Sequence, residues 1–183
     1  MNFTYVDNSN VYAEGCRASA IAKKMQGAET YIDAMNNKVV DRTWQIDYGH
    51  LHEFACGEKA EIGCAKLWGS PPPSDSFWKM VGRKGFEVKT YEKNFAGKEK
   101  KVDVAIAHQI TKDAYTGKIN KGTDEITLVA GDKDFCPVVD DLVENGFIVH
   151  VVFWDNVAPE LKAACSKFTS LNPFLSYVGK AGA

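Results

Sequence analysis

The sequence predicts an α/β fold with a central, mostly parallel sheet of about five strands. Segments rich in β-branched and aromatic residues alternate along the chain with segments of helical periodicity. Residues 125–130 and 147–153 are apolar almost throughout, which is typical of strands that helices cover on both faces. The alternation and the two apolar segments together favour a parallel sheet between two layers of helices.

Each expected strand is a short run of β-branched and aromatic residues. The first, FTYVD, ends at an aspartate, and the fourth, EITLVA, runs directly into a glycine. We expect the five strands at residues 3–7, 61–67, 86–91, 125–130 and 147–153.

Helix boundaries follow from capping and helix-ending residues. Ser74 or Asp75 can cap a helix over SFWKMVGRK, and Gly85 ends it. Pro159 is favoured in the first turn of a last helix. The other expected helices span residues 16–26, 47–56, 102–115 and 135–146. The stretch of about 13–45 is otherwise without a clear pattern, and we expect an insertion or an irregular arm there.

Length and composition indicate a single domain over residues 1–183. A chain of 183 residues can bury a hydrophobic core, and 45% hydrophobic with 25% charged residues are ordinary globular values. The formal net charge of −2 argues against a strongly basic coat for nucleic acids, although not against a local basic patch.

No targeting or metal-binding cysteine pattern is visible. Apolar runs stay well below the roughly 20 residues that cross a bilayer, and the N-terminus lacks the basic and apolar regions of a signal peptide. The five cysteines lack the close spacing of zinc ligands, so we expect reduced thiols. These features predict a cytoplasmic protein without membrane contacts.

Acidic residues stand at the ends of two expected strands. Asp7 ends the first strand, and Asp132 and Asp134 directly follow the fourth. In open parallel sheets, ligands bind beyond the carboxyl ends of the strands. We therefore expect these three carboxylates at one edge of the sheet.

A fourth acid lies on the apolar face of the helix expected at 102–115. Asp103 shares that face with Ile106, Ala107 and Ile110, which is the face meant for the sheet. Because Asp103 is in the first turn of this helix, its carboxylate points to the same edge of the sheet as the other three.

Converging carboxylates repel and raise one another's pKa unless a cation neutralises them. Oxygen ligands without histidine or cysteine favour a hard ion such as Mg²⁺ or Mn²⁺, and such a site suits phosphoryl chemistry. Each acid alone has a structural alternative as a cap or turn residue, with Asp134 as the N-cap of the helix after it. Asn10 could hold a metal-bound water or a phosphate oxygen, or act as a capping residue. The convergence favours the metal site.

Four motifs follow one another along the chain: YVDNSNVY (5–12), KKVDVAIA (100–107), LVAGDKDFCPVV (128–139) and GFIVHVV (146–152). In this order they resemble the NYN domain family of the PIN-like nuclease superfamily. The resemblance implies a three-layer Rossmannoid fold, a divalent metal site and hydrolysis of RNA phosphodiesters. By motif match it also implies that Asp7, Asp103, Asp132 and Asp134 are the catalytic and metal-binding acids, with Asn10 assisting.

The sequence departs from this family pattern at three positions. Gln109 stands where the family helix often carries a second acid, and Ser166 where the final helix often has an aspartate. Ala130 replaces a small hydroxyl residue. The four acids remain, but the departures leave the rate of cleavage and the choice between one and two ions open.

Two lysines are candidate contacts to an RNA backbone. Lys133 lies between the two aspartates that follow the fourth strand, and Lys101 lies in a lysine-rich segment just before Asp103. A solvated charge run is the alternative for Lys101. Trp68 follows the second expected strand and could stack on a base, with core packing as the alternative.

The leading functional hypothesis is a metal-dependent ribonuclease in which Asp7 or Asp132 orients the attacking water. We favour an endonuclease over an exonuclease, with single-stranded or structured RNA as partner, and leave a homo-oligomer open. One alternative is a catalytically inactive RNA- or protein-binding module of the same fold. Another is a haloacid-dehalogenase-type phosphatase, which needs a second aspartate where this chain has Ser9.

Overall fold

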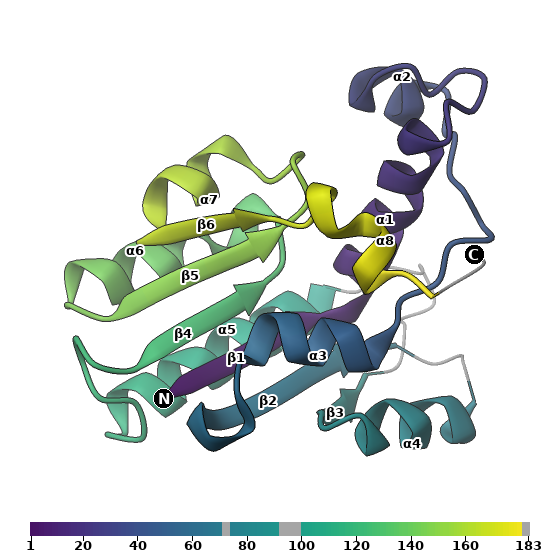
Figure 1. Cartoon of the computed structure of the whole chain (residues 1–183). Coiled ribbons are helices and arrows are strands. Elements are labelled where there is room, and N and C mark those ends of the chain that lie inside the picture. The colour runs from purple at the N-terminus through teal and green to yellow at the C-terminus, as the bar shows by residue number, and fades with distance from the viewer. Residues whose placement is uncertain (71–73, 92–99, 181–183) are drawn as a thin grey trace.

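The computed structural model describes residues 1–70, 74–91 and 100–180, with only the backbone of residues 100 and 101. Its centre is a sheet of six strands in the order β3-β2-β1-β4-β5-β6, and every neighbouring pair is parallel (Figure 1). The strands are β1 Asn2–Asp7, β2 Ile62–Gly69, β3 Glu87–Thr90, β4 Glu125–Val129, β5 Ile148–Phe153 and β6 Lys167–Ser170. The predicted parallel α/β sheet is confirmed.

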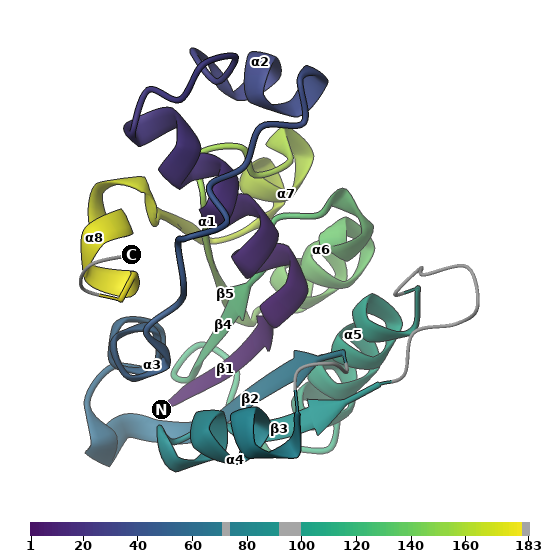
Figure 2. The same ribbon diagram turned by 90° about the vertical axis from the view of Figure 1, so that its right-hand side faces the viewer.

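Helices cover both faces of this sheet. One layer holds α3 and α8 and the other holds α5, α6 and α7, so the fold has three layers (Figure 2). The helices are α1 Asn8–Ala22, α2 Tyr31–Asn36, α3 Tyr48–Cys56, α4 Asp75–Arg83, α5 Lys100–Tyr115, α6 Cys136–Glu144, α7 Pro159–Ala164 and α8 Leu175–Val178. Short 3-10 turns are η1 Lys59–Glu61, η2 Lys133–Phe135 and η3 Asn172–Phe174. No helix in the described part of the chain is long and apolar enough to span a membrane.

The first helix begins earlier than predicted. Instead of spanning residues 16–26, α1 starts at Asn8, directly after β1, and ends at Ala22. Asp7 caps it, because its carboxylate accepts a hydrogen bond of 3.1 Å from the backbone N–H of Asn10. The polar DNSN segment resembles a turn in sequence, but this cap makes it the first turn of a helix.

The expected irregular arm is therefore shorter than predicted. Residues 23–47 leave the end of α1, form α2 and return beside it (Figure 1). Asp41 holds this return in place. It is 4% exposed, accepts a hydrogen bond of 2.7 Å from the hydroxyl of Ser19 on α1, and forms an ion pair of 2.8 Å with Lys23.

The last strand was not predicted. β6 is short and mostly polar, with the sequence KFTS, and it pairs only with β5 at the edge of the sheet. Its presence corrects the placement of Ser166, which was expected on the final helix. Ser166 lies just before β6, where its hydroxyl accepts a hydrogen bond of 3.1 Å from the N–H of Val149.

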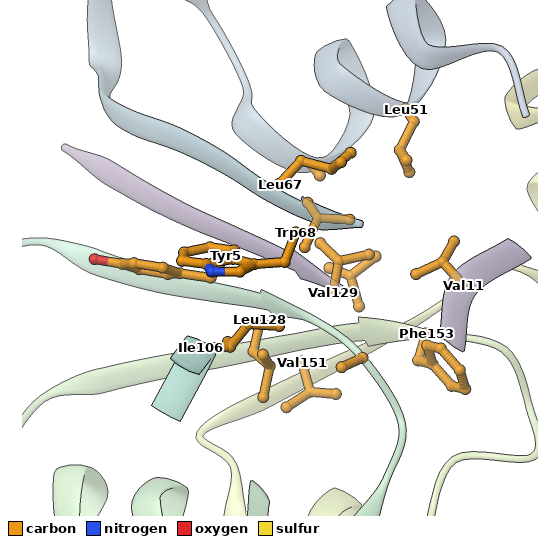
Figure 3. Packing of buried hydrophobic residues seen from close by; sticks show 14 of the residues in the cluster. Tyr5, Val11, Leu51, Leu67, Trp68, Ile106, Leu128, Val129, Val151 and Phe153 are labelled. Carbon is orange, nitrogen blue, oxygen red and sulfur yellow. The ribbon is translucent and has the colours of Figure 1, made fainter. Parts of the chain in front are cut away.

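Buried side chains fill both sides of the sheet (Figure 3). On the α5 side, Tyr5 and Trp68 stack with ring centroids 6.2 Å apart, and on the other side Leu67 points toward α3. Trp68 is 1% exposed because β2 continues past the predicted end at residue 67, so Trp68 is a core residue and not a stacking surface for a base. Since side chains alternate along a strand, Asp7 lies on the same side of the sheet as Tyr5.

Candidate active site

The chain leaves β4 through a tightly packed glycine. A Cβ at Gly131 would overlap the ring of Phe153, so this position accepts no side chain. The N–H of Gly131 donates a hydrogen bond of 2.9 Å to Oδ1 of Asn10, which follows β1. This contact fixes the ends of the two central strands against each other and directs the next residue, Asp132, to the edge of the sheet.

Asp132 and Asp134 lie in the turn that follows. Oδ1 of Asp132 accepts a hydrogen bond of 3.1 Å from the N–H of Asp134, which caps the 3-10 turn η2. The helix α6 then begins at Cys136 without a side-chain cap, so Asp134 is not the N-cap considered as its structural alternative. Both carboxylates are exposed at the carboxyl edge of the sheet.

Asp103 reaches the same place from α5. It lies in the first turn of that helix and is half-buried, and Ile106 and Ile110 on the same face are 0% and 1% exposed. Asp103, Asp132 and Asp134, hereafter the acid trio, each offer one carboxylate oxygen, and these oxygens lie within 4.8 Å of one another. The trio brings together one helix and one strand end that are distant in sequence.

Asp7 lies beside the trio but is not part of it. It is 4% exposed at the end of β1, where it caps α1, and it lines the same cleft as Asp103 and Asp132. Of the four predicted acids, three form the compact group that fits a metal ion and the fourth belongs to the wall next to it.

The predicted substrate contacts have different surroundings. Oδ1 of Asn10 is engaged by Gly131, whereas its Nδ2 has no hydrogen-bond partner among the described residues, and Asn10 lines the cleft. Lys133 is exposed between the two aspartates of η2. The side chain of Lys101 lies outside the described residues.

Gln109 takes part in a partly buried polar network around Asp113. Its Nε2 donates a hydrogen bond of 3.0 Å to Oδ1 of Asp113, and its Oε1 accepts one of 3.1 Å from Lys89 on β3. In the family that the sequence resembles, this position often carries an acid. In this protein, its side chain joins α5 to the sheet instead.

A cleft of about 850 Å³ opens beside the trio. Most of the residues that line it were not predicted from the sequence. Tyr48, for example, is 6% exposed and donates a hydrogen bond of 2.7 Å to Oδ1 of Asn8, and burial raises its pKa, so the hydroxyl stays protonated. The missed lining residues are Asn8, Ser9, Tyr12, Ala13, Gln45, Ile46, Tyr48, Ser70, Phe77 and Lys180.

One signal for this wall was present in the sequence. Tyr12 follows Asn8 by one helical turn, so a helix that starts at Asn8 places both on one face. The late start predicted for α1 concealed this relation. Gln45 and Lys180 carry no such signal, because their position depends on pairing between distant segments.

The donor set of the trio fits a hard divalent ion. Three carboxylates from a helix and a turn offer oxygen only, and Mg²⁺ and Mn²⁺ prefer oxygen ligands. Without such an ion, three negative charges at this separation repel one another.

Comparison with known proteins agrees with this architecture. The family model of the NYN domain matches residues 28–172, which include the trio and exclude Asp7 and Asn10. The crystal structure of a Vibrio parahaemolyticus protein of unknown function has a TM-score of 0.64 and 18% sequence identity, and the likeness covers 93% of this chain and 92% of that chain. At this identity it shows the fold alone. A search of curated proteins finds no match.

Proposed function

The chain belongs to the NYN domain family, a nuclease domain of the PIN-like superfamily, and from this membership we propose that it is a divalent-metal-dependent ribonuclease. The observation that carries the proposal is the convergence of Asp103, Asp132 and Asp134 at the carboxyl edge of the sheet. Parallel α/β folds bind their ligands at this edge.

The acid trio would hold Mg²⁺ or Mn²⁺, and Asp132 has a second task there. Its Oδ1 also fixes the turn that carries Asp134, so the position of one ligand depends on the other. When bound, the ion activates water and stabilises the charge that develops on the phosphate.

The remaining residues of the edge orient the reactants. Asp7, fixed by its contact with the N–H of Asn10, would direct the attacking water from the wall of the cleft. The Nδ2 group of Asn10 and the exposed ammonium group of Lys133 would donate to phosphate oxygens. Water would then attack phosphorus and release a proton to solvent, while the bond from phosphorus to the leaving ribose oxygen breaks and that oxygen takes up a proton from solvent. Lys101 stays a predicted phosphate contact.

Cleavage of labelled RNA by wild type and Asp132→Asn tests the proposal. Asparagine keeps an oxygen for the cap of η2 but removes the charge, so the fold should survive while cleavage in Mn²⁺ or Mg²⁺ falls at least about 100-fold. EDTA should abolish wild-type cleavage. The matched control is Asp140→Asn, since Asp140 is an exposed aspartate on α6 outside the trio and should be dispensable.

Melting temperatures give a second measure that does not depend on catalysis. An ion at a hundredfold excess over its Kd adds about 2.7 kcal/mol, which raises the melting temperature by about 5–11 °C. Wild type and Asp140→Asn should show this shift, and Asp132→Asn should lose most of it. A shift without cleavage of any RNA would reject the nuclease and favour an inactive binding module. If wild type shows neither a melting shift nor cleavage, the metal site is rejected as well.

A further inference from the structure

The cleft extends beyond the residues that the proposed chemistry uses. Its far wall consists of Tyr12 and Ala13 on α1, the segment of Gln45 and Ile46, and Lys180 near the C-terminus. This wall contains an exposed aromatic ring and an exposed cation next to a site for a phosphodiester. Such a combination can bind the nucleotide that adjoins the cleaved bond.

One face of the Tyr12 ring packs against Trp44, and the residue lines the cleft. Its side chain is 40% exposed, and its ring stacks on Trp44 at a centroid distance of 6.4 Å with an interplanar angle of 27°. Trp44 is in turn 4% exposed, packs against Gly15 of α1, and lies edge-on to Trp154 at 5.7 Å. The tyrosine ring is thus the outermost member of a packed aromatic series, which fixes its orientation before any ligand binds.

Polar donors line the same cleft as this ring, on a segment fixed by backbone pairing. The N–H of Lys180 donates a hydrogen bond of 2.9 Å to the carbonyl of Gln45, and Ile46 forms an antiparallel bridge with Gly179. The Lys180 ammonium donates to Oε1 of Gln45 at 3.0 Å. This leaves further N–H donors on Lys180 and the Nε2 group of Gln45 for a base edge or a phosphate.

The cleft selects the form of nucleic acid that can enter. A volume of about 850 Å³ is of the size that encloses a small ligand, and a base can stack on Tyr12 only if it is unpaired. Stacking on an aromatic ring tolerates every base, because each base has a π-face. The wall therefore favours single strands without strong sequence preference.

Given the ribonuclease function proposed above, we propose that Tyr12, Gln45 and Lys180 form a subsite for an unpaired base next to the phosphate at the acid trio. The substrate is then single-stranded RNA. Tyr12 supplies the stacking surface, and Gln45 and Lys180 fix the base or its phosphate by hydrogen bonds.

Binding measured in the cleavage-deficient Asp132→Asn background separates this subsite from catalysis. The probe is a fluorescently labelled single-stranded RNA, compared with a duplex of the same sequence, with fluorescence anisotropy as readout. Tyr12→Leu should weaken single-strand binding by about 5- to 150-fold, because stacking contributes about 1–3 kcal/mol per base. Tyr12→Phe keeps the ring and should remain within about twofold of its parent. Duplex binding should be weaker and insensitive to both changes.

The matched control is Tyr115→Leu. Tyr115 is 47% exposed and packs edge-on against Phe147 at 5.6 Å, but it ends α5 and does not line the cleft. Its replacement should leave RNA binding unchanged. Melting curves of all variants show whether the lost contact with Trp44 unfolds the protein, and Tyr12→Phe retains that contact.

The outcomes separate this subsite from the nuclease function. If Tyr12→Leu binds single strands as tightly as Tyr12→Phe, or if duplex binds as tightly as single strand, the base subsite is wrong even where wild type cleaves RNA. If Tyr12→Leu alone loses binding while wild type cleaves no RNA with any metal, the subsite stands and the nuclease function fails.

Discussion

Two regions of the molecule hold aspartates in opposite surroundings, although α5 contributes to both. In the Asp113 network, which consists of Asp113 with Tyr5, Lys66, Gln109 and Lys118, one carboxylate meets several donors. In the acid trio, three carboxylates meet one another. Both groups adjoin the same sheet, so the difference lies in the charges that surround each acid.

The Asp113 network is neutralised within the protein. Oδ2 of Asp113 accepts hydrogen bonds from the Lys66 ammonium at 2.6 Å and the Tyr5 hydroxyl at 2.8 Å, and Lys118 lies 3.6 Å from Oδ1. Asp113 is 5% exposed and Lys66 is 4% exposed. Burial opposes the charge of Asp113, but the hydrogen bonds from Lys66 and Tyr5 and the charges of Lys66 and Lys118 outweigh it and lower its pKa.

Two other buried acids also have a cation from the protein. Asp41 pairs with Lys23 at 2.8 Å, and Asp124 pairs with the N-terminal ammonium group at 2.7 Å. Within the described residues, by contrast, no ion pair joins Asp132 or Asp134 to a cation. Asp113, Asp41 and Asp124 each have a cation from the protein, whereas the exposed Asp132 and Asp134 have none among the described residues. The difference supports a cation from solution as the partner of these two carboxylates.

The largest expected effect on stability comes from removing the charge of Asp113. Asp113→Asn leaves the Lys66 ammonium buried without its counter-ion, which should lower the free energy of unfolding by about 3 kcal/mol and the melting temperature by about 6–12 °C. Asp134→Asn, measured in EDTA, should stay within about 0.5 kcal/mol of wild type or exceed it, because it removes repulsion. Denaturant unfolding of both variants measures the two values.

Equal losses in these two variants would erase the distinction between the regions. Cleavage assays should reverse the order, since Asp134→Asn removes a proposed ligand while Asp113→Asn leaves the trio intact. If only Asp113→Asn lost cleavage, the functional acid would lie in the Asp113 network and not in the acid trio.

A smaller effect should appear in the dependence of stability on pH. Because folding lowers the pKa of Asp113, its ionisation stabilises the folded state above the unfolded pKa of about 3.9. This contribution is lost as the pH falls through the folded pKa. The stability difference between wild type and Asp113→Asn should therefore shrink when the pH is lowered from about 5 toward 2. Urea unfolding over that range measures it, and a constant difference would mean that packing, not charge, explains the substitution.

Hydrophobic periodicity predicted the strands and helices that have a regular pattern of buried residues. The alternating strands and the apolar face of α5 placed three acids at one edge, because parallel strands end together and Asp103 shares a face with Ile106. The early start of α1 was missed, since asparagine and serine are common both in turns and in first helical turns. β6 was missed because four residues at a sheet edge, three of them polar, carry no clear burial pattern.

The surroundings of single polar residues could not be predicted from the sequence. The position of Gln109 suggested a missing metal ligand, yet the residue bonds Lys89 on β3 and Asp113 on its own helix. Which face of a helix a polar residue joins depends on partners from other strands, and one helical period does not specify them. The far wall of the cleft is hidden for the same reason, because Gln45 and Lys180 meet only through tertiary pairing.

Gln109→Glu gives the smallest expected effect and tests where the boundary between the two regions lies on α5. A glutamate there can still accept from Lys89, but it cannot donate to Asp113 and places a second negative charge beside it. We expect a loss of about 1 kcal/mol in stability, with metal-dependent cleavage unchanged. Gln109→Met, which keeps the volume without charge or donor, separates repulsion from the lost hydrogen bond. If the new carboxylate instead raises the affinity for Mn²⁺ or the rate of cleavage, residue 109 belongs to the metal site. The metal site would then extend along α5 toward Asp113.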